Sequence, residues 1–164
     1  LLEMSELRSV PCEDDVELGP LSEEVLTDLA PLAENKGIAL NCAGDALVIG
    51  SDTLLYRLVF NLVENAIRYS RTDSSVTVSI CDNDSHVFLR VEDQGPGIPK
   101  QYRESIFQPF FRLDKSRSRA YGGAGLGLAL VWEIAALHGG TVEVEASSEN
   151  GTTMLTTLPK RTAA

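Results

Sequence analysis

The sequence predicts one α+β domain, a two-layer sandwich in which a mostly antiparallel mixed sheet is covered on one face by helices. A chain of 164 residues with 43% hydrophobic content has the size of one domain with one core. Helical and alternating apolar patterns follow in the order helix, hairpin, helix, hairpin, loop, helix, hairpin. Successive hairpins favour antiparallel pairing, and the helices between them are expected to stack on one face.

The N-terminal part is interpreted as a connection followed by the first helix. Residues 1–15 have the pattern of a remnant of a connecting helix and an acidic, proline-containing linker, so the domain proper is expected over 16–164. The first helix is expected to begin at Ser22 with acidic residues in its first turn, and to end at Gly37. Pro31 falls inside this pattern and predicts a possible kink.

Three further helices and three hairpins are expected along the rest of the chain. Apolar or alternating runs predict hairpins formed by 38–40 with 46–49, 76–80 with 87–91, and 141–145 with 152–158. Helices are expected over 53–70 with a cap at Ser51-Asp52, over 99–107 as a short one, and over 126–138 as a buried one. The stretch 108–123 has little periodicity and is read as a long mobile loop, a length that is usually functional or disordered.

Charge excludes one class of partner and indicates another. The net charge of −10 and a sequence pI near 4.6 argue against a nucleic-acid binder, because phosphate backbones attract basic surfaces. No apolar stretch reaches the roughly 18 residues of a membrane span, and no leader pattern is present. One loop is basic, with Arg112, Lys115, Arg117 and Arg119 against a single Asp114. This loop predicts an anionic ligand or a docking surface.

The cysteines and histidines do not indicate a catalytic or metal centre. Cys12, Cys42 and Cys81 are far apart, odd in number and without C-x-x-C spacing, which argues against a disulfide framework and a zinc site. They are expected to be small buried hydrophobes in a reducing compartment. His86 and His138 lie near no nucleophile arrangement and are expected to be structural.

The helix expected over 53–70 contains a polar stripe among core-forming positions. At about 100° per residue, four polar side chains share one arc of this helix. They are Asn61, Glu64, Asn65 and Arg68. Buried amides and carboxylates cost free energy unless they are satisfied, so the stripe indicates a partner, a metal or a polar ligand. The alternative is a surface helix showing its solvated face.

Asp93 directly follows an expected strand and opens a turn that contains Gly95 and Gly97. The glycines allow the backbone to turn sharply and to approach a ligand closely. An Asp at the end of a strand is well placed to accept a hydrogen bond from an exocyclic amine. An ordinary Asp-containing turn has the same pattern, so the motif alone leaves both readings open.

A second glycine-rich stretch, 122–127, opens the last expected helix. Bare backbone amides at a helix N-terminus attract phosphate. Gly122 and Gly127 match the outer glycines of a P-loop, but Leu128 and Ala129 replace its Lys-Ser/Thr, and a G-x-G-x-x-G fingerprint is also absent. Phosphate charge must then be met by a metal and by arginines of the preceding loop.

In this order, the motifs resemble the catalytic and ATP-binding domain of sensor histidine kinases, which shares the Bergerat fold with gyrase, heat-shock chaperone and mismatch-repair ATPases. The resemblance covers about residues 16–159. Its motifs are Asn61-x-x-x-Asn65 with Arg68-Tyr69, Asp93-x-Gly95-x-Gly97, Phe107-x-Pro109-Phe110-Phe111-Arg112, Gly123-x-Gly125-Leu126-Gly127-Leu128, and Gly151-Thr152-Thr153. Each motif alone is weak, whereas the ordered set is specific. It implies an ATP-binding domain with a mobile lid.

The resemblance assigns roles to the polar stripe. It implies that Asn65 ligates an Mg²⁺ ion that bridges the ATP phosphates, with Asn61 in support. Arg68 stands where the family usually has Lys, and with Tyr69 it should contact phosphate and ribose. Glu64 is open: it orients water or the metal shell in catalysis, or it simply faces solvent.

The resemblance also assigns the base pocket and the lid. Asp93 would read the adenine amino group, Gly95, Gly97 and Ile98 would shape the base pocket, and Thr152 would close its adenine side. Three phenylalanines would anchor the lid: Phe107, Phe110 and Phe111. Arg112 would reach the γ-phosphate. The glycine-rich segment would hinge the lid and admit the phosphates, with binding residues Gly123, Ala124, Gly125, Leu126, Gly127 and Leu128.

Three other functions share this fold. A gyrase- or chaperone-type ATPase is similar, but those relatives use Glu at the position of Asn61 to activate water, so the Asn argues against hydrolysis as the main task. A non-catalytic nucleotide sensor or scaffold would keep the fold and use ATP only to order its lid. A serine kinase of the anti-sigma type differs only in substrate, and the Phe-rich segment favours the histidine-kinase branch.

The resemblance implies partners as well. The phosphoacceptor histidine of the family lies on a separate dimerisation domain, and residues 1–10 contain no histidine. The chain alone is therefore expected to bind ATP, to turn it over poorly and to be monomeric. Its expected partners are its own dimerisation domain and a response regulator, with no nucleic acid and no direct membrane contact. Family habit places this domain in the cytoplasm, on a membrane-anchored parent.

Overall fold

The computed structural model of the chain describes residues 9–109, 111 and 127–160. Its α-helices are α2 (Leu18–Lys36), α3 (Asp52–Tyr69) and α5 (Gly127–Leu137), and its short 3-10 helices are η1 (Lys100–Tyr102) and η2 (Ser105–Phe107). Its strands are β1 (Asp14–Glu17), β2 (Ala39–Ala43), β3 (Leu47–Gly50), β4 (Ser75–Asp82), β5 (His86–Asp93), β6 (Thr141–Ser148) and β7 (Gly151–Pro159).

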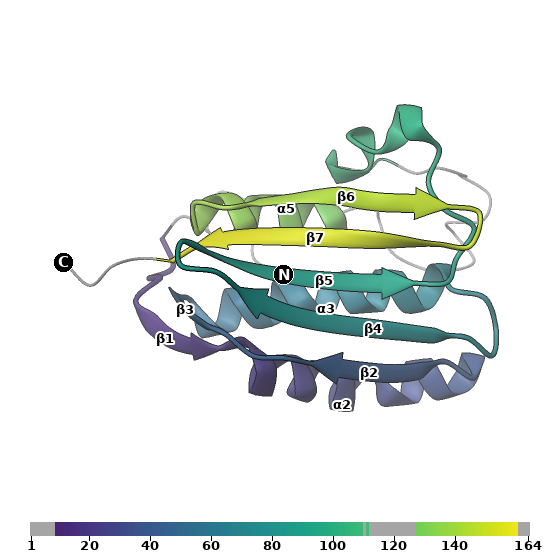
Figure 1. Cartoon of the computed structure of the whole chain (residues 1–164), viewed down its shortest axis with the longest axis horizontal. Coiled ribbons are helices and arrows are strands. Elements are labelled where there is room, and N and C mark those ends of the chain that lie inside the picture. Colours follow the sequence, from purple (N-terminus) through teal and green to yellow (C-terminus); the bar gives the residue numbers. More distant parts are fainter. Residues whose placement is uncertain (1–8, 110, 112–126, 161–164) are drawn as a thin grey trace.

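These elements form two layers. A five-stranded sheet has the order β2-β4-β5-β7-β6, and a separate two-stranded sheet pairs β1 with β3. The three α-helices lie behind the large sheet (Figure 1), so the apolar side chains of one sheet face and of the helices share a single core. The predicted α+β sandwich is confirmed.

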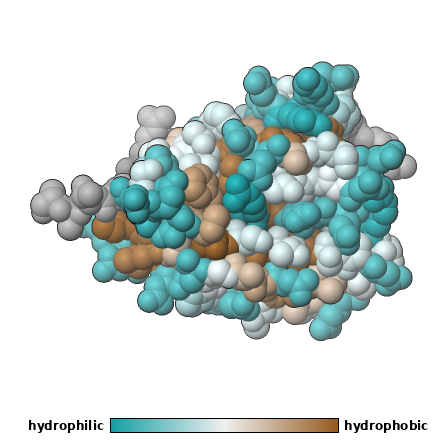
Figure 2. All heavy atoms as spheres, in the orientation of Figure 1, coloured by the Kyte–Doolittle hydropathy of each residue, from teal (hydrophilic) through white to brown (hydrophobic). Residues whose placement is uncertain are grey.

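Among the described residues, no helix covers the opposite face of the large sheet (Figure 1). Leu89 and Val91 of β5 point into the core, so the side chain between them, Arg90, lies on the open face. There it makes a two-pronged ion pair with Glu145 of β6, at 2.7 and 2.9 Å. Figure 2 views this face and shows hydrophilic side chains over much of it, with hydrophobic ones gathered towards the left.

The first helix begins earlier than the sequence predicted. It starts at Leu18, one turn before Ser22, and its first-turn residues Leu18 and Leu21 are buried. The Asp45 carboxylate accepts hydrogen bonds from the Gly19 N–H at 2.7 Å and from the Ala46 N–H at 2.8 Å. A partner for the first helical turn thus comes from a residue 26 positions along the chain, which no local capping pattern reveals. Gly37 ends the helix in the left-handed conformation, as predicted.

The hairpin expected over 38–49 is wrong. β2 pairs parallel with β4, whereas β3 pairs antiparallel with β1, so the two runs belong to different sheets. Gly44, between them, has a φ of +89° and lies so close to the Ile80 carbonyl of β4 that a Cβ atom would collide with it. The connection therefore runs against β4 instead of closing a turn. Asp14 and Asp15, expected in a linker, form part of β1.

Helix α3 forms where predicted. Ser51 caps its N-terminus, and its Oγ accepts a hydrogen bond from the Leu54 N–H at 3.2 Å. Eight apolar residues of α3 are buried, and burying each of the leucine, valine and isoleucine side chains among them contributes about 1.5–3 kcal/mol. They are Leu54, Leu55, Leu58, Val59, Leu62, Val63, Ala66 and Ile67.

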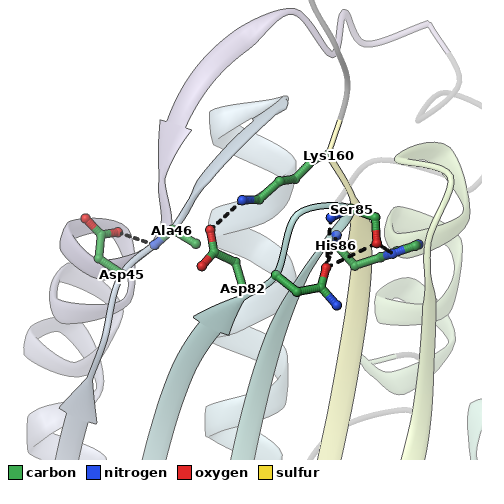
Figure 3. A network of polar contacts seen from close by, with 7 residues as sticks. Asp45, Ala46, Asp82, Ser85, His86 and Lys160 are labelled. Carbon is green, nitrogen blue, oxygen red and sulfur yellow. Dashed lines mark hydrogen bonds and ion pairs between the residues drawn. The ribbon is translucent and has the colours of Figure 1, made fainter.

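The other two hairpins are confirmed. β4 pairs antiparallel with β5, and β6 pairs antiparallel with β7. In the β4–β5 turn the Asn83 side chain accepts hydrogen bonds from the N–H groups of Ser85 and His86, at 2.9 and 2.8 Å. Lys160, just after β7, reaches Asp82 beside this turn at 2.6 Å (Figure 3). The expected short helix over 99–107 consists of two 3-10 turns.

His138 holds two helices together, and the cysteines are less buried than expected. His138 is buried at the end of α5, where Nδ1 lies 2.7 Å from the Ile134 carbonyl and Nε2 accepts a hydrogen bond from the Ser51 N–H at 3.0 Å. It thereby joins the end of α5 to the start of α3. All three cysteines are free, but Cys81 is exposed and the other two are only partly buried. Their predicted burial is wrong: Cys12 precedes β1, Cys42 lies on the edge strand β2, and Cys81 alternates with the buried Ile80 and so lies on the open face of β4. Within the described ranges, no helix is long and apolar enough to cross a membrane.

Candidate nucleotide-binding site

Asp93 ends β5 as a buried carboxylate with one oxygen fixed by backbone. It is 8% exposed, and its Oδ1 accepts hydrogen bonds from the N–H groups of Gly95 at 2.9 Å and Thr152 at 3.1 Å. Burial raises the pKa of Asp93, while these two hydrogen bonds act in the opposite direction. Its other oxygen, Oδ2, has no hydrogen-bond partner among the described residues. One side of this carboxylate is held, and the other is available to a ligand.

Three backbone segments meet around Asp93, and glycines at the contact points allow these segments to come close together. A Cβ atom on Gly95 would lie 2.5 Å from the carbonyl oxygen of Tyr69, the last residue of α3. Gly97, with a φ of +85°, is packed against the Ser148 carbonyl, and Gly151 against the carbonyl of Asp93. The end of α3, the turn after β5 and the β6–β7 turn are thus packed together at the right-hand end of the sheet (Figure 1).

Ser147 joins these segments and was not singled out from the sequence. Its Oγ accepts a hydrogen bond from the Ile98 N–H at 2.8 Å and lies 2.8 Å from Thr152 Oγ1. A β-bulge between Val144 and Ala146 shifts the register, so that Ser147 pairs with Thr152 across the strands. Simple alternation along β6 would place Ser147 on the open face with Glu143. The sequence carried no signal for this contact because it depends on the bulge.

The polar stripe of α3 is partly buried, as a binding surface requires. Asn61, Glu64, Asn65 and Arg68 are each intermediate in exposure, between the core and the open surface. Glu64 and Arg68 form an ion pair one turn apart at 3.7 Å. The side-chain amides of Asn61 and Asn65, also one turn apart, make no hydrogen bond within the described residues. These amides are available to bind.

The donor set of this stripe fits Mg²⁺. Magnesium prefers oxygen ligands and is usually held by one or two protein groups together with substrate phosphates and water. The amide oxygens of Asn61 and Asn65 and the carboxylate of Glu64 are ligands of this kind. Within the described ranges no three His, Cys, Asp or Glu side chains come together, so a cation here would rely on Asn oxygens and on the nucleotide.

Two phenylalanines next to the loop pack against other aromatic rings, one on α5 and one on η1. Phe107 is buried, with its ring 5.5 Å from that of Trp132, and Phe111 lies 5.7 Å from the ring of Tyr102. A hollow of about 370 Å³ lies beside them, lined by Glu104, Phe107, Gln108, Pro109, Ala129, Trp132 and Glu133. None of the predicted nucleotide residues of α3 or of the Asp93 turn lines this hollow, so it is distinct from the site around Asp93.

Several predicted residues lie outside the described residues. They are Phe110, Arg112, Gly123, Ala124, Gly125 and Leu126. Of the same segment, Gly127 begins α5, where an added Cβ would meet no atom of the described residues within 4 Å, and Leu128 packs against the core. The structure brings together Tyr69, Asp93, Gly95, Gly97, Ile98 and Thr152, with Asn61 and Asn65 on the helix that ends there.

Comparison with known proteins decides the family. The profile of a family described as "Histidine kinase-, DNA gyrase B-, and HSP90-like ATPase" matches residues 50–162, more than half of the chain. The chain belongs to this family. Its members bind ATP through this domain, so nucleotide use follows for this chain as well.

Relatives of known class place the chain among sensor histidine kinases. It is 37% identical over 164 residues to the sensor-like histidine kinase SenX3 of Mycobacterium tuberculosis, covering 97% of this chain and 40% of that protein. To the sensor protein RstB of Escherichia coli it is 48% identical over 98 residues, 60% of this chain and 22% of RstB. The chain thus spans about two-fifths of the length of SenX3.

Solved structures agree. A mycobacterial sensor histidine kinase, MprB, superposes with a TM-score of 0.79 at 30% identity, covering 92% of this chain and 99% of that one. The catalytic domain of the histidine kinase ThkA gives a TM-score of 0.76 at 28% identity, over 90% and 96% of the two chains. The chain is an ATP-binding catalytic domain of the sensor histidine kinase type, as the ordered motifs predicted.

Proposed function

We propose that this domain binds Mg-ATP and transfers its γ-phosphoryl group to a histidine on a separate dimerisation domain, within a two-component signalling pathway. The observation that supports it most is the state of Asp93. This buried carboxylate has Oδ1 held by two backbone N–H groups and Oδ2 without a partner in the described part of the chain. A carboxylate held in this way is suited to accept a hydrogen bond from an exocyclic amine.

The base would lie against the turn after β5. Asp93 Oδ2 accepts from the adenine amino group, and Thr152 lies beside this carboxylate because its N–H is bound to Oδ1. Gly95 and Gly97 leave room for the flat ring, and the partly buried Ile98 offers it an apolar contact. A guanine base would present an oxygen to Asp93, so the site favours adenine.

The phosphates would extend along α3. Asn65 holds the cation, Asn61 supports it from the preceding turn, and Arg68 and Tyr69 at the helix end contact phosphate and ribose. Magnesium, when bound, neutralises charge that develops on the transferring phosphoryl group. Glu64 is engaged by Arg68 at 3.7 Å, and we propose that it orients Arg68 instead of acting as a base. Arg112 is proposed to contact the γ-phosphate.

The acceptor histidine is proposed to lie elsewhere. His138 is buried with both ring nitrogens in hydrogen-bond contacts, and His86 is the first residue of β5, with Nδ1 2.8 Å from Ser85 Oγ. Both positions suit structural roles. We therefore infer a dimerisation domain as the first partner and a response regulator as the second, with the parent protein anchored at the membrane and this domain on its cytoplasmic side.

A transfer experiment tests this function. The domain is incubated with Mg-ATP labelled at the γ-phosphate and with a histidine-bearing dimerisation domain from its own parent. Acid-labile, base-stable label on that partner is the expected result. Release of phosphate without any partner would favour a gyrase-type ATPase instead, in which case Glu64→Ala should abolish the activity. Tight ATP binding without transfer would favour a nucleotide sensor.

A further inference from the structure

The turn after β5, residues 93–98, is built to be flexible and yet is held from both ends. Its two glycines, Gly95 and Gly97, lower its intrinsic stiffness, and Gly97 has a φ of +85°. A flexible binding loop lowers affinity, because its conformational freedom must be lost when the ligand binds. In this structure, hydrogen bonds from two arginine side chains limit this freedom before any ligand binds.

Arg71 holds the first end of the turn. This residue lies just beyond α3, and its own N–H donates to the Gln94 carbonyl at 3.3 Å. Its guanidinium donates from Nη1 to the same carbonyl at 3.2 Å and from Nη2 to the carbonyl of Glu149 in the β6–β7 turn. One planar group therefore ties residue 94 to residue 149, 78 positions away from Arg71.

Arg103 holds the other end in the same manner. Its Nε donates to the Ile98 carbonyl at 3.3 Å, and its Nη2 donates to the carbonyl of Ser147 at 3.1 Å. Arg71 and Arg103 are thus two forks that tie the two ends of this turn to the end of β6 and the turn that follows it. All four acceptors are backbone carbonyls, so the geometry of the main chain, and not its side chains, is what the two arginines fix.

We propose that Arg71 and Arg103 form an arginine clamp that positions the adenine pocket and sets affinity for the base. They are positioning residues: they act through the carbonyls of residues 94, 98, 147 and 149 and need not touch the nucleotide. The inference rests on the proposed nucleotide function of Asp93 and Thr152. The clamp brings the segments that carry these two residues into fixed register, so that Asp93 Oδ2 and Thr152 face the same space.

Charge attraction between the arginines and ATP is the competing explanation, and ligand choice separates the two. Adenosine carries no charge and reports on binding of the base and ribose without the phosphates. Tripolyphosphate with Mg²⁺ reports on the phosphate contacts of α3 alone. A clamp that acts through the pocket changes adenosine binding and leaves tripolyphosphate binding unchanged, whereas charge attraction does the reverse.

The test measures binding of ATP, adenosine and Mg-tripolyphosphate by calorimetry to the parent domain and to Arg71→Met, Arg103→Met and the double variant. Methionine keeps the apolar stem and removes the fork. Each single variant is expected to lose roughly threefold to tenfold in adenosine and ATP affinity, and the double variant roughly ten- to a hundredfold. Tripolyphosphate affinity should stay within a factor of about two.

Two controls complete the design. Arg57→Met removes an α3 arginine that makes no hydrogen bond or ion pair among the described residues, and it should bind all three ligands like the parent. Arg71→Lys keeps the positive charge and the apolar stem but cannot donate two hydrogen bonds from one planar group. Its adenosine affinity should therefore fall, as for Arg71→Met. This variant keeps the test decisive if Arg71→Met folds poorly.

Two results would overturn the clamp. One is a double variant that binds adenosine within a factor of about two of the parent. The other is an equal loss of adenosine and tripolyphosphate affinity, which would show that the variants disturb the domain as a whole and not the base pocket. A parent domain that binds neither ATP nor adenosine would instead refute the proposed nucleotide function, so the two failures are distinguishable.

Discussion

Lys36, the last residue of α2, closes the C-terminus of α3, and its removal should destabilise the domain markedly. Its ammonium donates hydrogen bonds to the carbonyls of Ile67 at 3.0 Å, Arg68 at 2.9 Å and Ser70 at 2.6 Å. The last carbonyls of a helix have no partner within the helix, and a cation there also meets the negative end of the helix dipole. The perturbation is Lys36→Met, which keeps the stem and removes the charge.

The magnitude follows from these three bonds. Hydrogen bonds that involve a charged group contribute about 1.5–3 kcal/mol each. The net total is smaller than the sum, because the ammonium is partly desolvated and the freed carbonyls regain water; burial, followed by the nearby Arg68, lowers the pKa of Lys36. We expect a loss of about 2–4 kcal/mol in the free energy of unfolding, or roughly 5–15 °C in Tm for a domain of this size.

The assay is urea unfolding at pH 7, with Lys160→Met as a matched control. Lys160 pairs with Asp82 at 2.6 Å on the surface (Figure 3), and such a pair contributes only about 0–1 kcal/mol. Lys36→Met should also weaken ATP binding, because the turn it frees carries Arg68 and Tyr69. A Lys36→Met domain as stable as Lys160→Met would refute the reasoning.

Three further predictions concern the site itself. Asp93→Asn keeps an oxygen for the Gly95 and Thr152 N–H groups but replaces Oδ2 with a donor, so ATP affinity should fall by about a hundredfold. Because burial raises the pKa of Asp93, its ionised carboxylate destabilises the ligand-free fold, and this loss of stability grows as the pH rises through the folded-state pKa. Asp93→Asn should therefore be more stable than the parent at pH 7 and lose this advantage in acid. Urea unfolding at neutral and at acidic pH measures the difference. Asn65→Ala should abolish the Mg²⁺ dependence of nucleotide binding in calorimetry, and equal Mg-ATP affinity in variant and parent would disprove the metal role. Gly97→Ala forces a φ of +85° on a residue with a Cβ that meets the Ser148 carbonyl; a strain of about 1–2 kcal/mol should displace the turn and reduce adenosine binding, whereas unchanged binding would show that the turn tolerates the methyl group.

The sequence by itself determined the elements whose signal is local. The apolar period of α3 and its cap at Ser51 require only a few neighbouring residues, and the β4–β5 and β6–β7 hairpins follow from alternation and a short turn. The ordered motifs around Asn65, Asp93 and Thr152 were sufficient to indicate the family, because each motif is a run of chemically constrained residues. These features share one property: the residues that specify them lie close together in the chain.

The tertiary structure decided what depends on distant partners. β2 and β3 look like a hairpin in sequence, but Asp45 binds the start of α2, and the chain at Gly44 runs against β4. Lys36, Arg71 and Arg103 resemble other surface cations in sequence, yet each bonds to backbone carbonyls of segments brought close by folding. Every residue has a backbone carbonyl that can accept a hydrogen bond, so the order of side chains in the sequence does not indicate which carbonyls these cations bind. Only the folded backbone determines which carbonyls a long side chain can reach.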